Sequence, residues 1–125
     1  MKSYSDLEQS KKLAEILPLE SADMCYKCIE DDPYDIVCKP YSEWKEEYKG
    51  LLIRNDAKVI PCWSFAALFD ALPDGTDIVK EEADTENEKY MCTVGVKDDI
   101  ISTFGNNPVD ACVLMIEKLY ELKML

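Results

Sequence analysis

The chain has 125 residues, 47% of them hydrophobic and 32% charged, a balance typical of one folded domain and not of a collagen-like, low-complexity or wholly disordered protein. Fourteen basic residues against 26 acidic ones give a net charge of −12, which disfavours direct binding of nucleic acid or of an anionic membrane. Histidine is absent, so the most common general base and metal ligand is missing. We therefore expect no cofactor.

The N-terminal residues predict a helix followed by a hairpin. Ser5 and Glu8 have the spacing of a capping box, with Ser5 as the N-cap, and Pro18 ends the helical pattern. Residues 24–29 and 34–38 favour strands on either side of a turn. No apolar run follows the first lysine, as a secretory signal would require, so we expect a cytoplasmic protein.

The cysteines raise the question of a metal site. Cys25 and Cys28 form a C-x-x-C pair, and Cys38 follows ten residues later. A structural zinc site needs four converging ligands, and in a strand these two cysteines would point to opposite faces. We expect free thiols with buried, structural roles, and metal binding by Cys25, Cys28 and Cys38 stays open as the alternative.

The middle of the chain predicts two helices around a short strand. Aromatic and aliphatic residues recur at helical spacing over 41–52, and residues 58–60 favour a strand that Pro61 ends. Ser64 is a suitable N-cap for a helix over 65–72. Because that helix is apolar on nearly all sides, we expect it to be buried on nearly all sides.

An acidic segment with two strands follows. Residues 77–83 and 89–96 favour strands, and the alternating apolar residues of the second predict a half-buried strand. Charges in the first predict a sheet edge that is protected against aggregation. Between Asp70 and Glu88 there are eight acidic residues and one lysine. The candidate interaction surface consists of the acidic residues of this segment, Asp77, Glu81, Glu82, Asp84, Glu86 and Glu88.

The C-terminal part predicts one more strand and the longest helix. Residues 100–104 favour a strand, and Asn107 and Pro108 are an N-cap and a first helical residue. Asp110 lies in the first turn, where the helix dipole favours a carboxylate. The apolar residues after it recur at helical spacing. We expect an α+β single domain over residues 1–125: a small antiparallel β-sheet packed against helices, with a long C-terminal amphipathic helix.

Three segments resemble those of a known group of proteins. Residues 59–73, with the letters VIPCWSFAALFDALP, are similar to an IPxxS block that ends in LP, and residues 107–116 are similar to an NPxDA helix opening. Residues 21–26 resemble the N-terminal part of the same group, which consists of small bacterial and phage- or prophage-encoded proteins of unknown function. The resemblance implies a cytoplasmic α+β domain carried on a mobile element, and it supplies no catalytic residue.

Two functional hypotheses follow from the sequence. The first is a non-enzymatic accessory or protein-interaction domain, because histidine is absent and no catalytic motif occurs. The second is an acidic decoy or immunity-type inhibitor that binds a basic nucleic-acid-binding protein through the acidic segment. Both predict a protein partner, a basic one in the second case, and neither fixes the oligomeric state. A carboxylate- or thiol-based enzyme is the least favoured reading.

Overall fold

The computed structural model describes residues 2–27, 35–53, 58–80, 90–96 and 98–125. Its elements, in chain order, are α1 (Leu7–Leu13), the 3-10 turn η1 (Leu19–Ser21), β1 (Met24–Lys27), β2 (Asp35–Val37), the 3-10 turn η2 (Tyr41–Glu43), α2 (Glu46–Ile53), β3 (Val59–Cys62), α3 (Phe65–Ala71), β4 (Asp77–Lys80), β5 (Tyr90–Val96), β6 (Asp99–Gly105) and α4 (Pro108–Glu121). The α+β class and the long C-terminal helix are therefore confirmed.

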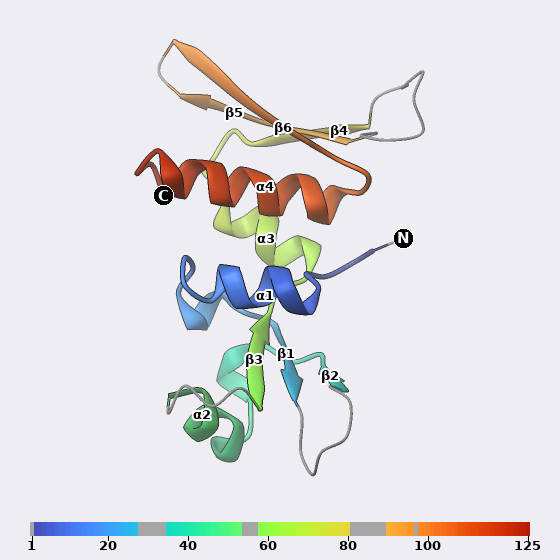
Figure 1. Ribbon diagram of the computed structural model, residues 1–125, viewed down its shortest axis with the longest axis vertical. Coiled ribbons are helices and arrows are strands. Elements are labelled where there is room, and N and C mark those ends of the chain that lie inside the picture. Colours follow the sequence, from blue (N-terminus) through green and yellow to red (C-terminus); the bar gives the residue numbers. More distant parts are fainter. Residues whose placement is uncertain (1, 28–34, 54–57, 81–89, 97) are drawn as a thin grey trace.

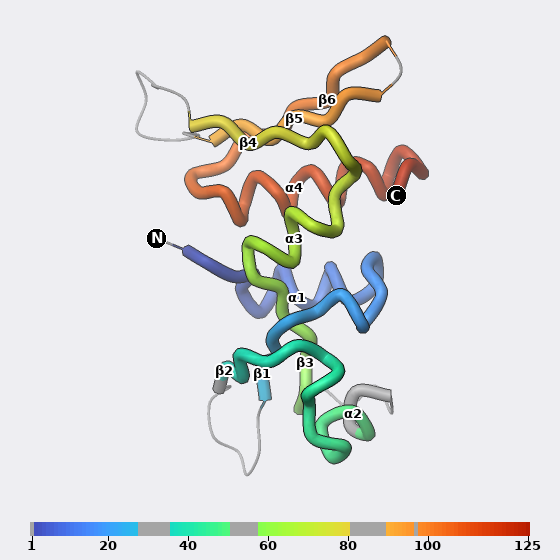
Figure 2. The backbone as a smooth tube through the Cα atoms, turned by 180° about the vertical axis from the view of Figure 1, so that it is seen from behind, coloured from blue at the N-terminus to red at the C-terminus, as the bar shows by residue number. Residues whose placement is uncertain are grey.

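The elements are stacked along the long axis of the molecule. The strands form two three-stranded antiparallel sheets, with orders β2-β1-β3 and β4-β5-β6. Helix α4 lies beneath the β4–β5–β6 sheet, α3 and α1 come next, and the other sheet lies at the opposite end with α2 beside it (Figure 1). The view from behind shows the same order (Figure 2). The helices that make up the middle of the molecule thus separate the two sheets.

The smaller sheet contains the predicted hairpin and one correction. Strand β1 pairs antiparallel with β2, with Cys25 opposite Val37, and with β3, with Cys25 opposite Pro61. The prediction that Pro61 ends its strand is wrong, because β3 continues to Cys62. Strand β3 is an edge of the sheet, where a residue without an N–H group is tolerated.

Helix α1 begins one residue later than predicted. Its N-cap is Asp6, whose side chain accepts from the Gln9 amide while the Gln9 side chain accepts from the Asp6 amide. Ser5 is instead buried, and its Oγ accepts from the Trp63 amide (3.1 Å) and bonds Ser10 Oγ (2.8 Å). This contact with Trp63, the residue after β3, withdraws Ser5 from capping and leaves that role to the exposed Asp6.

The single helix predicted over 41–52 is divided. The 3-10 turn η2 ends at Glu43, and α2 begins at Glu46. Between them Trp44 has extended backbone angles, and its indole N–H donates to the Lys39 carbonyl (2.7 Å). Trp44 and Tyr48 are both buried, so the aromatic residues of this segment serve packing.

Helix α3 forms as predicted but is less buried than expected. Ser64 Oγ accepts from the Ala67 amide, which confirms the N-cap. Leu68 is fully buried, whereas Phe69 is 40% exposed, because α3 contacts α4 on one side only.

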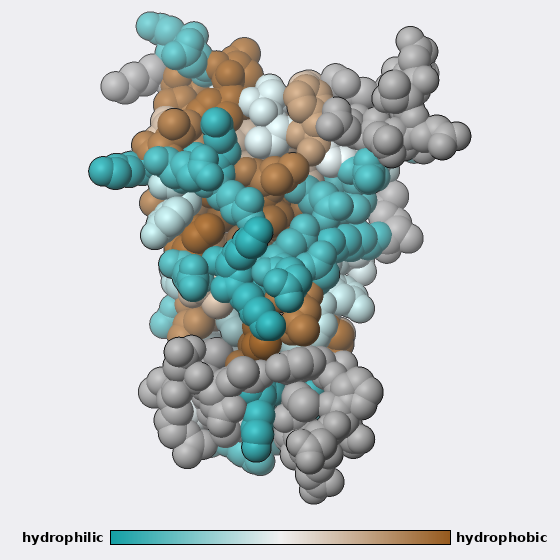
Figure 3. Space-filling model, in the orientation of Figure 1, coloured by the Kyte–Doolittle hydropathy of each residue, from teal (hydrophilic) through white to brown (hydrophobic). Residues whose placement is uncertain are grey.

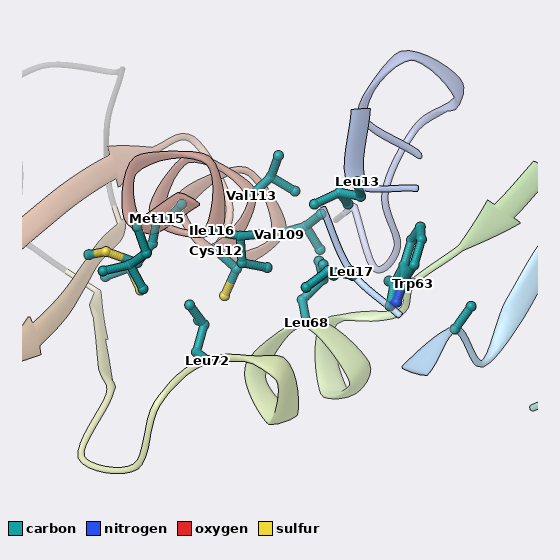
Figure 4. Packing of buried hydrophobic residues seen from close by; sticks show 14 of the residues in the cluster. Leu13, Leu17, Trp63, Leu68, Leu72, Val109, Cys112, Val113, Met115 and Ile116 are labelled. Carbon is teal, nitrogen blue, oxygen red and sulfur yellow. The ribbon is translucent and has the colours of Figure 1, made fainter. Parts of the chain in front are cut away.

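The core is one cluster that extends from the β4–β5–β6 sheet through α4, α3 and α1 to β1, β3 and α2. Side chains that meet there include Leu13 from α1, Leu68 from α3, and Val109 and Ile116 from α4 (Figure 4). Trp63 is also fully buried, and its indole N–H donates to Ser21 Oγ (2.9 Å). Asn107 caps α4 and Pro108 begins it, as predicted.

Candidate interaction surface

The β4–β5–β6 sheet has one covered face and one open face. Cys92 and Val94 of β5 are buried against α4, as the alternation of that strand predicted. On the same side, Thr103 Oγ1 of β6 donates to the Ala111 carbonyl of α4 (2.8 Å). The opposite side, which we call the outer face, has no covering layer among the described residues (Figure 1).

The outer face carries a row of apolar side chains that crosses all three strands. Val79 of β4 is paired with Met91 of β5, which is paired with Phe104 of β6. Val79 is 45% exposed and Phe104 is 40% exposed. Ile100, which lies four residues before Phe104 on the same face of β6, is 72% exposed. The space-filling view shows hydrophobic surface over the β5–β6 hairpin (Figure 3). A contiguous apolar patch on a small domain marks an interaction site more often than scattered exposed residues do.

One polar group on this face lacks a partner. Thr93 Oγ1 is shielded from solvent and makes no hydrogen bond within the described part of the chain. Thr93 lies on β5 between Asp77 of β4 and Ser102 of β6, both in register with it. Burial of a hydroxyl without a hydrogen bond is unfavourable, so Thr93 is a locally unsatisfied position in the middle of the sheet.

The two edges of this sheet differ in charge. Strand β4 is an edge, as predicted, and carries Asp77 and Lys80. Strand β6 is the other edge, and its residues 100–104 contain no charge, proline or glycine. Edge strands are normally protected by such residues, because their free N–H and C=O groups are a template for another strand. Apart from Asp99 at its start, β6 lacks this protection within the described part of the chain.

A groove runs beside β6 where the strand meets α4. It has a volume of about 260 Å³ and is lined by Thr103 and Phe104 of β6 and by Leu114, Glu117, Lys118 and Glu121 of α4. Leu114 is 45% exposed there. The groove therefore adds an apolar side chain and charges of both signs to the uncharged strand edge.

The predicted acidic surface is described only in part. Asp77 is exposed and lies on the outer face, in register with Thr93. Its other members, Glu81, Glu82, Asp84, Glu86 and Glu88, lie outside the described residues.

The candidate metal ligands include one buried and one exposed thiol. Cys25 is buried in β1, and Cys38 is exposed just after β2, while Cys28 lies outside the described residues. Within the described ranges, no three cysteine or acidic side chains form a group able to hold a metal ion. Burial raises the pKa of the Cys25 thiol to about 11, so this side chain stays protonated at neutral pH.

A buried polar cluster connects strands β1 and β3 to Ser5, which lies just before α1. Cys62 Sγ donates to the Ser5 carbonyl (3.4 Å), and Tyr26 Oη donates to the same oxygen (2.8 Å). Burial raises the pKa of the Cys62 thiol and of the Tyr26 hydroxyl. Burial thus keeps both groups neutral, and their hydrogen bonds to the Ser5 carbonyl fix the N-terminal segment on the sheet.

Asp110 is held in a network of donors. It accepts from Lys2 Nζ (2.8 Å), from Gln9 Nε2 (2.9 Å) and from Asn107 Nδ2 (2.9 Å). Burial opposes its ionisation, but these hydrogen bonds, with Lys2 first, hold the pKa of Asp110 below its usual range. The bonds from Lys2 and Gln9 tie α4 to the N-terminal segment, and the bond from Asn107 lies within the N-terminal cap of α4, so this carboxylate has a structural role.

An apolar cleft of about 430 Å³ lies between the end of α1 and α3, away from the outer face. Its lining includes Ile16, Ala67 and Ala71, and Asp70 contributes its one carboxylate. Asp70 is exposed, which agrees with a position on the solvated edge of its helix.

Sequence reasoning missed the outer face. The signal was present in the alternation of β5 and β6, since every residue between the buried ones must point to the other side. Met91, Phe104 and Ile100 are apolar at such positions. Only the arrangement of the layers shows that nothing described covers them.

The comparisons with known proteins give no relative for this chain. It matches no protein-family model, no curated protein and no solved structure. In the described part of the chain, no helix is long and apolar enough to cross a membrane.

Proposed function

We propose that this protein is a non-enzymatic accessory domain that binds another protein through the outer face of its β4–β5–β6 sheet. The observation that carries the proposal is the apolar row of Val79, Met91 and Phe104, which crosses three strands; Val79 and Phe104 are exposed and Met91 is half-buried between them. Burial of such a row against a partner would be favourable by about 25 cal/mol per Å² of apolar surface.

The polar side chains away from this face support the non-enzymatic reading. The carboxylate of Asp110 and the hydroxyl of Ser5 are both occupied by bonds between elements of the fold. The thiols of Cys25 and Cys62 are buried and protonated. A reactive nucleophile or base needs access to its substrate and an activated form, which these groups lack.

A second candidate is an acidic decoy or immunity-type inhibitor of a basic nucleic-acid-binding protein. Asp77 favours it, because this exposed carboxylate lies on the outer face itself, and the chain carries a net charge of −12. The proposed setting is the cytoplasm, and the proposed origin a phage or another mobile element. Neither candidate binds nucleic acid or a membrane directly.

Capture from lysate of the native host tests the first candidate. Immobilised wild type and the Val79→Lys and Leu122→Lys variants are loaded at low salt, and bound proteins are identified by mass spectrometry. Val79 and Leu122 have similar exposure, 45% and 46%, but Leu122 lies at the end of α4 and not on the outer face. We expect one enriched protein that Val79→Lys loses and Leu122→Lys retains. Equal capture by all three proteins would remove the outer face as the binding site.

The second candidate has its own test with the same captured protein. Reversal of Glu81, Glu82 and Asp84 to lysine should abolish binding, and salt should release the wild-type complex sharply, because charge complementarity would drive association. An unchanged affinity in the triple variant would eliminate the decoy reading and leave the apolar face as the site.

A further inference from the structure

Strand β6 offers a second binding surface that is distinct from the outer face. Among the described residues no strand pairs with the edge of β6 that lies away from β5, so the N–H and C=O groups that point outward there, in the plane of the sheet, are open to another strand. The other edge strands differ from it: β2 has three residues, β3 contains Pro61, and β4 carries Asp77 and Lys80. Strand β6 has seven residues, and the six that follow Asp99 are uncharged.

We infer that β6 pairs antiparallel with β6 of a second copy of this chain, about a two-fold axis at Ser102. This register pairs all seven residues, because Ser102 is the centre of Asp99–Gly105. Two sheets of three strands would join into one sheet of six. The inference goes beyond the proposed function, since it concerns the edge of the sheet and another occupant.

The register makes the edge complementary to itself, as a two-fold interface requires. On the outer face, Ile100 would lie opposite Phe104 of the second copy, so each of these exposed apolar residues gains an apolar cross-strand neighbour. On the side of α4, Ile101 would lie opposite Thr103. Asp99 would lie opposite Gly105, and no acidic residue of the strand would face another.

The groove beside β6 fits the same occupant. Leu114 is exposed in it, and Lys118 lies between Glu117 and Glu121 along its wall. The two-fold axis would bring the α4 helices of both copies side by side under the joined sheet. Lysine and glutamate side chains of one helix could then approach those of opposite sign on the other, and Leu114 would be covered.

The lack of charge on residues 100–104 favours a second copy of this edge over a basic segment as its occupant. Residues 100–104 carry no carboxylate that would attract a basic strand. Two copies that each carry −12 repel at long range, but this repulsion is screened beyond about 8–10 Å at physiological salt. Added salt should therefore strengthen the dimer, whereas it should weaken the binding of a basic partner.

A charge exchange at the two-fold axis tests the inference. In this register Ser102 faces itself, so Ser102→Lys and Ser102→Glu each place like charges opposite one another, while a mixture of the two variants places opposite charges there. Val79→Lys is the control, because it adds the same charge to the same face on the far edge strand. Masses are measured by sedimentation velocity from about 1 µM to about 1 mM protein.

We expect wild type and Val79→Lys to dimerise equally, and each Ser102 variant alone to associate about tenfold more weakly. An equimolar mixture of the two Ser102 variants should recover wild-type affinity or exceed it. Circular dichroism and the urea midpoint of each variant establish that it is folded.

Two results would overturn the inference. One is a monomeric wild type over the whole concentration range, and the other is a dimer that responds to Val79→Lys but not to Ser102→Lys. Neither result bears on capture of a partner by the outer face, which the monomer can perform. A capture failure with an intact dimer would conversely refute only the proposed function.

Discussion

Replacement of Gly105 by alanine should destabilise the protein by about 1–3 kcal/mol, the usual cost of forcing an extra methyl group into a packed site. Gly105 is buried at the end of β6, and an added Cβ would lie 2.7 Å from the Ala111 amide nitrogen and 3.1 Å from the Asp110 carbonyl carbon. Both are backbone atoms of the first turn of α4, so no flexible side chain can move aside. Strand and helix would have to separate at their junction.

Gly95 provides a matched control in the same sheet. It lies on the outer face of β5, and nothing stands within 4 Å of an added Cβ. Gly95→Ala should therefore stabilise the protein by about 0.4–1 kcal/mol, because alanine restricts the unfolded chain more than glycine does. Urea unfolding measures both free energies, with the midpoint shifted by about 1 M for a loss of 2 kcal/mol. If Gly105→Ala were as stable as wild type, the close packing of β6 on α4 would be refuted.

Three further predictions concern the polar groups of the fold. Ser5→Ala should cost about 1–3 kcal/mol in urea unfolding, because it leaves the buried Trp63 amide without an acceptor; a loss below about 0.5 kcal/mol would contradict this. Asp110→Asn should reduce stability most near neutral pH: a carboxylate with a lowered pKa stabilises the fold above about pH 4, and this contribution disappears as the pH falls through the folded-state pKa. If the urea midpoint of Asp110→Asn lay below that of wild type by the same amount at pH 7 and at pH 3, the stabilising role of the ionised Asp110 would be contradicted. Iodoacetamide at pH 8, with peptide mapping, should label the exposed Cys38 and spare Cys25, whose pKa is about 11, until urea unfolds the chain; equal labelling of both in the native protein would refute the burial of Cys25.

Local signals in the sequence were sufficient for the C-terminal half of the fold. Asn107 and Pro108 specify the start of α4 through capping and a fixed φ, and both act within one turn of the helix. The alternation of β5 predicts its buried face, because side chains of a strand point to opposite sides in turn. Neither inference depends on residues far away in the chain.

Contacts between distant residues decided the N-terminal half. Ser5 and Asp6 are both good N-caps, and the choice between them depends on the Trp63 amide, 58 residues from Ser5. Pro61 remains inside a strand because β3 is an edge, which depends on its pairing with β1. No local pattern reports either relationship.

The candidate site shows the same division. Asp77 was identified from the charge of its segment, which is a local property. The outer face could not be, since Val79, Met91 and Phe104 become one row only when three strands are placed in register. Their exposure further requires that α4 cover the opposite face of the sheet.

The two proposed surfaces are compatible because they use different directions of the same sheet. Pairing of β6 with a second copy occurs in the plane of the sheet and leaves the outer face open. The apolar row would then continue across the two-fold axis, from Phe104 of one copy to Ile100 of the other. A dimer would present two equivalent outer faces to one partner, so a partner with two matching segments would bind with avidity that the Ser102→Lys monomer lacks. The comparison is made at a protein concentration where wild type is dimeric and Ser102→Lys is monomeric. Equal partner affinity of these two proteins would show that the two surfaces act independently.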